Sequence, residues 1–117
     1  MEALIKNIPQ AAPLPLAGQV SCQPGQIVSK TLAQDKRHSL TLFAFDRGEE
    51  ISTHASDGDA MVIGLEGRGI VTVGGTPHPL EAGETIVMPA QIPHTVAAAE
   101  PFKMLLTVVF PLGEGEE

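Results

Sequence analysis

The segments Gly48-Glu-Glu-Ile-Ser-Thr-His54 and Gly83-Glu-Thr-Ile-Val-Met-Pro89-Ala-Gln-Ile-Pro-His94 are the most informative stretches of this 117-residue chain. Each begins with a glycine, continues as a short β-prone run and ends at a histidine. Glycine and proline beside such runs are typical of short strands that end in turns. The two segments therefore predict strands of a β-rich fold, with one histidine close to the end of each.

Apolar runs of strand length occupy most of the remaining chain, between regularly spaced glycine and proline residues. No segment keeps an apolar period of 3.6 residues over the dozen or so residues that a stable amphipathic helix needs. Gly74-Gly75 is typical of a tight hairpin turn. The eight predicted strands are 26–33, 39–45, 51–54, 60–65, 70–73, 85–88, 95–98 and 103–110, with weaker candidates near Gln19 and Pro77. We predict an all-β sandwich or closed barrel.

The amino-acid composition disfavours some classes of partner and indicates the cellular compartment. Fourteen acidic and seven basic residues give a net charge of -7, which disfavours nucleic acids and anionic membranes as partners. The single Cys22 excludes an intrachain disulfide and is typical of a reducing compartment, so we expect a cytoplasmic protein. We expect one domain over 1–117, with a barrel core over about 26–110, an N-terminal arm over 1–17 and an acidic tail over 112–117.

The two opening segments resemble the two motifs of the cupin superfamily, G-x5-H-x-H-x3,4-E-x6-G and G-x5-P-x-G-x2-H-x3-N. The first motif would run over 48–67 and the second over 83–98. The matching residues are Gly48, His54, Gly67, Gly83, Pro89 and His94. The resemblance is to small single-domain cupins of the RmlC-like, cupin 2 conserved barrel type. It implies a double-stranded β-helix, which is a jelly-roll barrel.

Four positions depart from the two motifs. Ser56 stands at the second histidine, Ala60 at the glutamate, Gln91 at the glycine and Ala98 at the final asparagine. In metal-binding cupins the three histidines and the glutamate are the usual ligands, so the resemblance leaves His54 and His94 as the metal ligands. Stable sites commonly use at least three protein ligands. Two alternatives stay open: the protein binds one divalent metal ion (Fe, Mn, Ni or Zn), or it binds no metal.

A third metal ligand would have to come from elsewhere in the chain. Glu50 lies four residues before His54, ~13 Å away along a strand that rises about 3.3 Å per residue, and is too distant. Strand alternation turns Asp57 and Asp59 away from His54, unless the turn at 57–58 changes the register. Other candidates, each in a loop or beside a turn, are Gln91, His38 and His78.

The expected binding pocket lies in the mouth of the barrel, where apolar side chains and a few polar groups hold one small ligand. By alternation Ser52, His54 and Ser56 share one strand face, which we take as the inner face. Methionines 61, 88 and 104 are expected to fill the interior, and Phe43 and Phe45 to share one sheet face. The predicted pocket residues are His54, Ser56, Ala60, Met88, Gln91 and His94.

The sequence thus predicts a protein that binds a small organic ligand in the barrel mouth, with or without a metal held by the two histidines. The alternative is a metal-dependent cupin enzyme (dioxygenase, isomerase or lyase) that acts on a small organic acid. A third interpretation makes the barrel mainly a dimerisation unit. We expect a homodimer, because aliphatic strand segments outside the core need cover and single-domain cupins are commonly dimers.

Overall fold

The computed structural model describes residues 3–53 and 56–112. It contains the 3-10 helix η1 (Leu16–Gln19) and the strands β1 (Ile27–Gln34), β2 (His38–Phe45), β3 (Glu50–Thr53), β4 (Asp59–Glu66), β5 (Arg68–Val73), β6 (Thr76–Glu81), β7 (Thr85–Met88), β8 (His94–Ala98) and β9 (Phe102–Val109). In the part of the chain so described, no helix has the length and apolar character to cross a membrane.

The predicted strands are confirmed with small shifts at their ends. All eight appear, and the weaker candidate near Pro77 is the strand β6. The candidate near Gln19 is wrong, since that segment is η1, in which the Gly18 N–H donates to the Pro15 carbonyl over 3.1 Å. The fixed φ of a proline, here -79°, suits entry into a helical turn.

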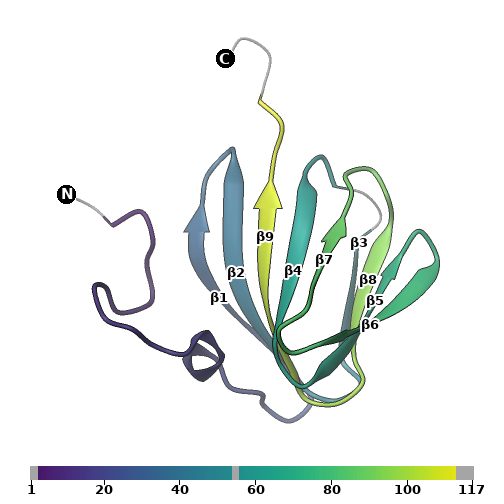
Figure 1. Ribbon diagram of the computed structural model, residues 1–117, viewed down its shortest axis with the longest axis horizontal. Coiled ribbons are helices and arrows are strands. Elements are labelled where there is room, and N and C mark those ends of the chain that lie inside the picture. The colour runs from purple at the N-terminus through teal and green to yellow at the C-terminus, as the bar shows by residue number, and fades with distance from the viewer. Residues whose placement is uncertain (1–2, 54–55, 113–117) are drawn as a thin grey trace.

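The strands form two antiparallel sheets that face each other as a jelly-roll barrel, which confirms the expected fold (Figure 1). The first sheet, sheet A, has the order β1-β2-β9-β4-β7, and the second, sheet B, has the order β3-β8-β5-β6. The sheets converge at one end, where the connections 46–49, 82–84 and 99–101 lie, and diverge at the other. We call these the closed end and the open end.

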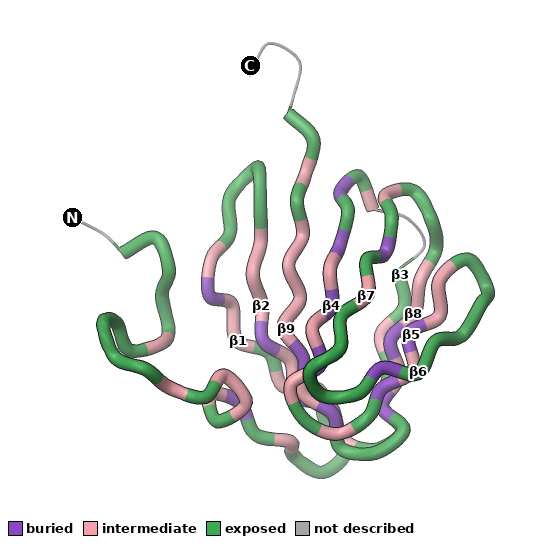
Figure 2. Tube along the Cα trace, viewed as in Figure 1, coloured by how far each residue is buried: buried purple, intermediate pink, exposed green. Residues whose placement is uncertain are grey.

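The main core fills the space between the sheets, and buried positions gather where the sheets converge (Figure 2). The ring centroids of Phe45 and Phe102, both fully buried, lie 6.0 Å apart, and Phe43 lies 6.0 Å from Phe45. The expectation that Phe43 and Phe45 share one face is therefore confirmed. Met61 does not join this core as expected, because its neighbours Ala60 and Val62 face inward and alternation turns Met61 outward.

Two glycines permit the tight packing at the closed end. A Cβ on Gly69 would lie 2.7 Å from the ring of Phe102, so the ring rests directly on the backbone of β5. Gly67 has φ +75°, and a Cβ there would overlap the Pro101 carbonyl oxygen. At the opposite end, Gly74 (φ +56°) and Gly75 (φ +88°) form the expected hairpin turn between β5 and β6.

A second apolar cluster lies on the outer face of sheet A and includes side chains from residues 3–22. This segment is longer than the arm expected over 1–17; we call it the N-terminal arm from here on, and it runs beside the edge strand β1 (Figure 1). The arm is tied to the edge strand β1 by two hydrogen bonds, from Lys6 N to Leu32 O (2.8 Å) and from Asn7 Nδ2 to Thr31 O (2.6 Å). Lys103 Nζ donates to the Ala17 carbonyl over 2.7 Å. The cluster comprises Ile8, Leu16, Val20, Cys22, Val28, Leu32, Leu40, Leu42, Ala44, Leu65 and Leu105.

Candidate functional site

His94 is the first residue of β8 and stands at the open end of the barrel. It pairs across the sheet with Thr53 of β3 and with Val73 of β5. Val96 and Ala98, two and four residues further along β8, are buried in the main core. Because side chains alternate along a strand, His94 lies on the same inner face as these two residues, half-buried at the mouth.

The His94 ring is oriented by its own loop. Its Nδ1 lies 3.3 Å from the carbonyl oxygen of Ile92, a long hydrogen bond in which the carbonyl accepts. A carbonyl acceptor at this position favours the tautomer with the ring proton on Nδ1, which leaves the lone pair on Nε2. Nε2 is then able to accept a hydrogen bond from a ligand or to bind a metal ion.

The inner face around the mouth is otherwise mainly apolar. Ala60 of β4 and Met88 of β7 are direct cross-strand neighbours, 3% and 2% exposed, and both belong to the main core. Leu106 and Val108 of β9 pack against the same core. The predicted pocket residues Ala60 and Met88 thus line the barrel interior at the open end, and Ala60 brings only a methyl group to the position of the motif glutamate.

Gln91 points away from the interior and is exposed. Its φ of +66° lies in the left-handed region, which explains why the cupin motif has a glycine at this position. This conformation costs a residue with a Cβ ~1–2 kcal/mol. Two hydrogen bonds offset the cost, from Gln91 N to Ser56 O (2.8 Å) and from Gln91 Nε2 to Asp57 Oδ1 (3.0 Å).

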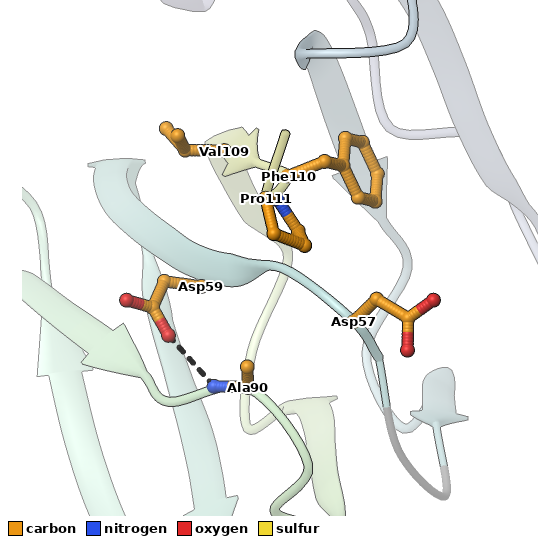
Figure 3. A pocket seen from close by; sticks show the side chains of 6 residues that line it. All are labelled: Asp57, Asp59, Ala90, Val109, Phe110 and Pro111. Atoms are coloured by element: carbon orange, nitrogen blue, oxygen red, sulfur yellow. Dashed lines mark hydrogen bonds between the residues drawn. The ribbon is translucent and has the colours of Figure 1, made fainter. Parts of the chain in front are cut away.

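Asp59 adds a third hydrogen bond between the same two segments, because its Oδ1 accepts from Ala90 N over 2.8 Å (Figure 3). We call Ser56, Asp57, Asp59, Ala90 and Gln91 the mouth clamp. It joins the turn after the first motif histidine to the loop that precedes His94. The clamp therefore positions the loop on which the ring of His94 depends, a role that the sequence alone did not indicate.

The two aspartates of the clamp do not converge on a common point. They line a hollow of about 310 Å³ together with Val109, Phe110 and Pro111, and their carboxylates point in different directions (Figure 3). Each carboxylate accepts a hydrogen bond from the 90–91 loop. Both are therefore clamp residues that hold the 90–91 loop.

Ser52 does not lie on the inner face as expected. Ile51 packs against the main core and sets the alternation of β3, so Ser52 faces outward, with its Oγ 3.2 Å from Thr95 Oγ1. Ser56 is half-buried, and its Oγ accepts from Gly58 N over 3.2 Å. The predicted pocket and metal residue His54 lies outside the described residues.

The other candidate metal ligands are dispersed. Asp35 Oδ1 lies 3.0 Å from His38 Nδ1 and accepts hydrogen bonds from the backbone of His38 and Arg37, which lower the pKa of Asp35. His78 is exposed on the edge strand β6. Glu50 opens β3, opposite Ala97. Over residues 3–53 and 56–112, no group of three or more His, Cys, Asp or Glu side chains is placed to hold a metal ion. The described residues therefore do not form a metal site by themselves.

Comparisons with known proteins agree with this architecture. The family profile described as Cupin domain matches residues 41–110. A conserved protein of unknown function from Streptococcus pyogenes has a similar structure, with a TM-score of 0.91 and 42% identity over 96% of this chain and 98% of that one. A cupin superfamily protein from Desulfitobacterium hafniense gives a TM-score of 0.87 and 32% identity, over 93% of this chain and 100% of that one.

One curated relative has a named activity. The dimethylsulfoniopropionate lyase DddW of Ruegeria pomeroyi is 32% identical in a 93-residue alignment that covers 74% of this chain. The chain spans only 61% of the length of that lyase. The similarity thus relates this barrel to part of an enzyme.

Proposed function

Because the chain belongs to the cupin family, we propose that it binds a small organic ligand at the open end of its barrel, with His94 as the polar anchor. The observation that carries this proposal is the orientation of the His94 ring. The bond from Nδ1 to the Ile92 carbonyl directs Nε2 to partners other than the protein's own loop. Apolar pockets with a few well-placed polar groups are the usual form of small-molecule sites.

The lining of the mouth indicates the chemistry of the ligand. The hollow of about 310 Å³ that His94 lines is also lined by Thr53, Thr72 and Pro93, and the inner face of the barrel is apolar at Ala60, Met88 and Val73. An imidazole that accepts through Nε2 favours a ligand that donates a hydroxyl proton beside a small apolar body. A small hydroxy acid or an alcohol meets both requirements.

Titration calorimetry with a panel of small acids and alcohols tests the proposal. We expect His94→Ala to weaken binding at least tenfold, and His78→Ala, a change at an exposed histidine on edge strand β6, to leave it unchanged. Equal binding by the wild type and His94→Ala would contradict the role of His94. No binding by any member of the panel would contradict the proposed ligand class.

A second candidate function is a metal-dependent lyase, and the 32% identity to the dimethylsulfoniopropionate lyase favours it. A metal would need His54 and His94 together, with water or substrate completing the coordination. Elemental analysis of protein purified without a histidine tag separates the two functions. A stoichiometric metal that is lost in His54→Ala, with turnover of dimethylsulfoniopropionate, would favour the enzyme. A metal-free protein that binds small acids would favour the binding protein.

The assembly that we propose is a homodimer. Its support is the apolar character of strand faces outside the main core, which a second copy would cover. Sedimentation equilibrium tests it, since a species of 12.3 kDa at every concentration would contradict the dimer.

A further inference from the structure

Three hydroxyl side chains lie side by side on the outer face of sheet B, at the open end of the barrel. Ser52 of β3 is the direct cross-strand neighbour of Thr95 of β8, and Thr95 is in turn the neighbour of Thr72 of β5. All three face outward, because an adjacent residue of each strand packs into the main core. Neighbouring strands are about 4.8 Å apart, so the three side chains form one row across the sheet. We call Ser52, Thr95 and Thr72 the hydroxyl row.

The hydroxyl row lines the hollow of about 310 Å³ to which His94 also contributes. The other lining residues are Thr53, Gly75 and Pro93. Gly74 N donates to the Pro93 carbonyl over 2.9 Å, which holds the loop before β8 against the hairpin between β5 and β6. A Cβ on Gly75 would meet no atom within 4 Å, so the hairpin leaves its side of the hollow open. The hollow is thus an accessible recess with room for one small molecule.

The hydroxyls of the hollow retain hydrogen-bonding capacity. Ser52 Oγ and Thr95 Oγ1 lie 3.2 Å apart, and whichever of them donates, one hydroxyl proton and lone pairs on both oxygens remain. Among the described residues, none forms a hydrogen bond with the hydroxyl of Thr72 or of Thr53. The hollow therefore offers donors and acceptors together. A ligand hydroxyl, which also both donates and accepts, matches this pattern.

The charge around the hollow disfavours an anionic ligand. None of the described residues that line it is a carboxylate, a lysine or an arginine. Glu50 lies on the same outer face, two residues before Ser52 on β3, and the chain has a net charge of -7. A ligand carboxylate would gain no opposite charge in the hollow and would be repelled by the field of the protein. A neutral ligand avoids this repulsion.

We propose that the hollow selects a neutral ligand with several hydroxyl groups, a polyol or a monosaccharide, and that the hydroxyl row hydrogen-bonds to two or more of those groups. The inference rests on the ligand site proposed above and narrows its ligand class. His94 binds one ligand hydroxyl, the row binds others, and Pro93 offers an apolar surface to the carbon chain. A ligand with a single hydroxyl uses only the first of these contacts.

Titration calorimetry with compounds that differ in their number of hydroxyl groups tests the ligand class. We expect affinity to rise from propanol to glycerol to sorbitol. Sorbitol should bind more tightly than gluconate, which has the same carbon chain and ends in a carboxylate. No binding of glycerol or sorbitol, or tighter binding of gluconate, would overturn the inference. Binding of propanol and lactate through His94, with no gain from added hydroxyls, would overturn it and leave the proposed ligand site intact.

Removal of single hydroxyl groups tests the row. Thr72→Val and Thr95→Val keep the branched shape of the side chain, and each should weaken sorbitol binding about fivefold, the net contribution of one hydrogen bond. Thr107→Val is the matched control, since Thr107 is a half-buried threonine on β9 of sheet A, and it should bind sorbitol like the wild type. Circular dichroism verifies that the variants fold. Unchanged sorbitol binding by both row variants would overturn the role of the row.

His94→Ala separates this inference from the proposed function. It should weaken the binding of propanol and sorbitol alike, whereas Thr72→Val should weaken only the binding of sorbitol. Loss of sorbitol binding in Thr72→Val but not in His94→Ala would contradict the role of His94 and support the row. In nuclear magnetic resonance spectra, sorbitol should shift the amide signals of Thr72, Gly75 and Thr95. Shifts confined to residues outside the hollow would overturn the site.

Discussion

The closed end of the barrel is tightly packed, whereas the open end contains a half-buried histidine and a strained backbone. At the closed end Phe102 is fully buried against the backbone of Gly69. Gly67, which follows β4, packs directly against the carbonyl of Pro101, which precedes β9. At the open end His94 is half-buried, and Gln91 holds a strained φ of +66°. The difference indicates that the closed end carries most of the stability, while the open end accepts strain to position one imidazole.

The largest effect is expected from Phe102→Ala. Loss of this buried ring leaves a cavity between the sheets and should lower the free energy of unfolding by ~3–5 kcal/mol. Phe110→Ala, at a half-buried phenylalanine of the open end, should cost less than half as much. Urea unfolding measures both, and equal losses would remove the contrast between the ends.

Gly67→Ala should cause the next largest loss in the free energy of unfolding. A left-handed φ costs ~1–2 kcal/mol for alanine, and displacing the Pro101 carbonyl adds ~1–3 kcal/mol. Gly75→Ala, at φ +88° but with no atom within 4 Å of the added Cβ, should lose only the first of these amounts. Thermal and urea unfolding of the two variants compare a crowded glycine at the closed end with an open one. A larger loss in Gly75→Ala would contradict the packing argument.

Asp59→Ala should loosen the mouth clamp. Removal of the acceptor for Ala90 N should cost ~1 kcal/mol and increase amide hydrogen exchange in the 90–92 loop. Asp59→Asn keeps an acceptor oxygen and should stay close to the wild type. Unchanged exchange in Asp59→Ala would show that the loop is held by other contacts.

Gln91→Gly should change stability by less than ~1 kcal/mol, because relief of the left-handed strain offsets the lost hydrogen bond to Asp57. Gln91→Ala keeps the strain and also loses the bond, so it should be the less stable of the two. The urea concentrations at the midpoints of unfolding rank the two variants by stability. The reverse order would contradict the account of strain at the open end.

The smallest effect on stability is expected from a change of Asp35, which lies in the exposed turn between β1 and β2. The backbone N–H groups of His38 and Arg37 hold the pKa of this carboxyl below its usual value of 3.8. A lowered pKa in the folded state stabilises the fold above the usual value, and this contribution is lost as the pH falls through the folded-state pKa. Asp35→Asn resembles the protonated carboxyl, so it should match the wild type near pH 2, be slightly less stable than the wild type at pH 7 and lack this part of the acid dependence. Unfolding midpoints between pH 2 and 5 measure it, and identical curves would contradict the shift.

Much of this fold could be predicted because its signals are local. The strands alternate between turn residues at short intervals, and the Gly74-Gly75 turn follows from the freedom of glycine at positive φ. The nearness of His94 to a strand could also be predicted, since the predicted strand 95–98 begins one residue after it. The outward directions of Ser52 and Met61 were missed, because alternation relates the residues of one strand to each other but does not say which side of the strand faces the core.

The sequence by itself thus determined the β class, the approximate position of most strands and the nearness of His94 to a strand, since these depend on neighbours along the chain. Only the tertiary structure decided which face of each strand points inward, how Asp57 and Asp59 join the loop before His94, and where the N-terminal arm lies on sheet A. These features depend on contacts between residues far apart in the sequence, such as Asn7 and Thr31, 24 positions apart, and Asp59 and Ala90, 31 positions apart. Such contacts exist only after the two sheets have packed.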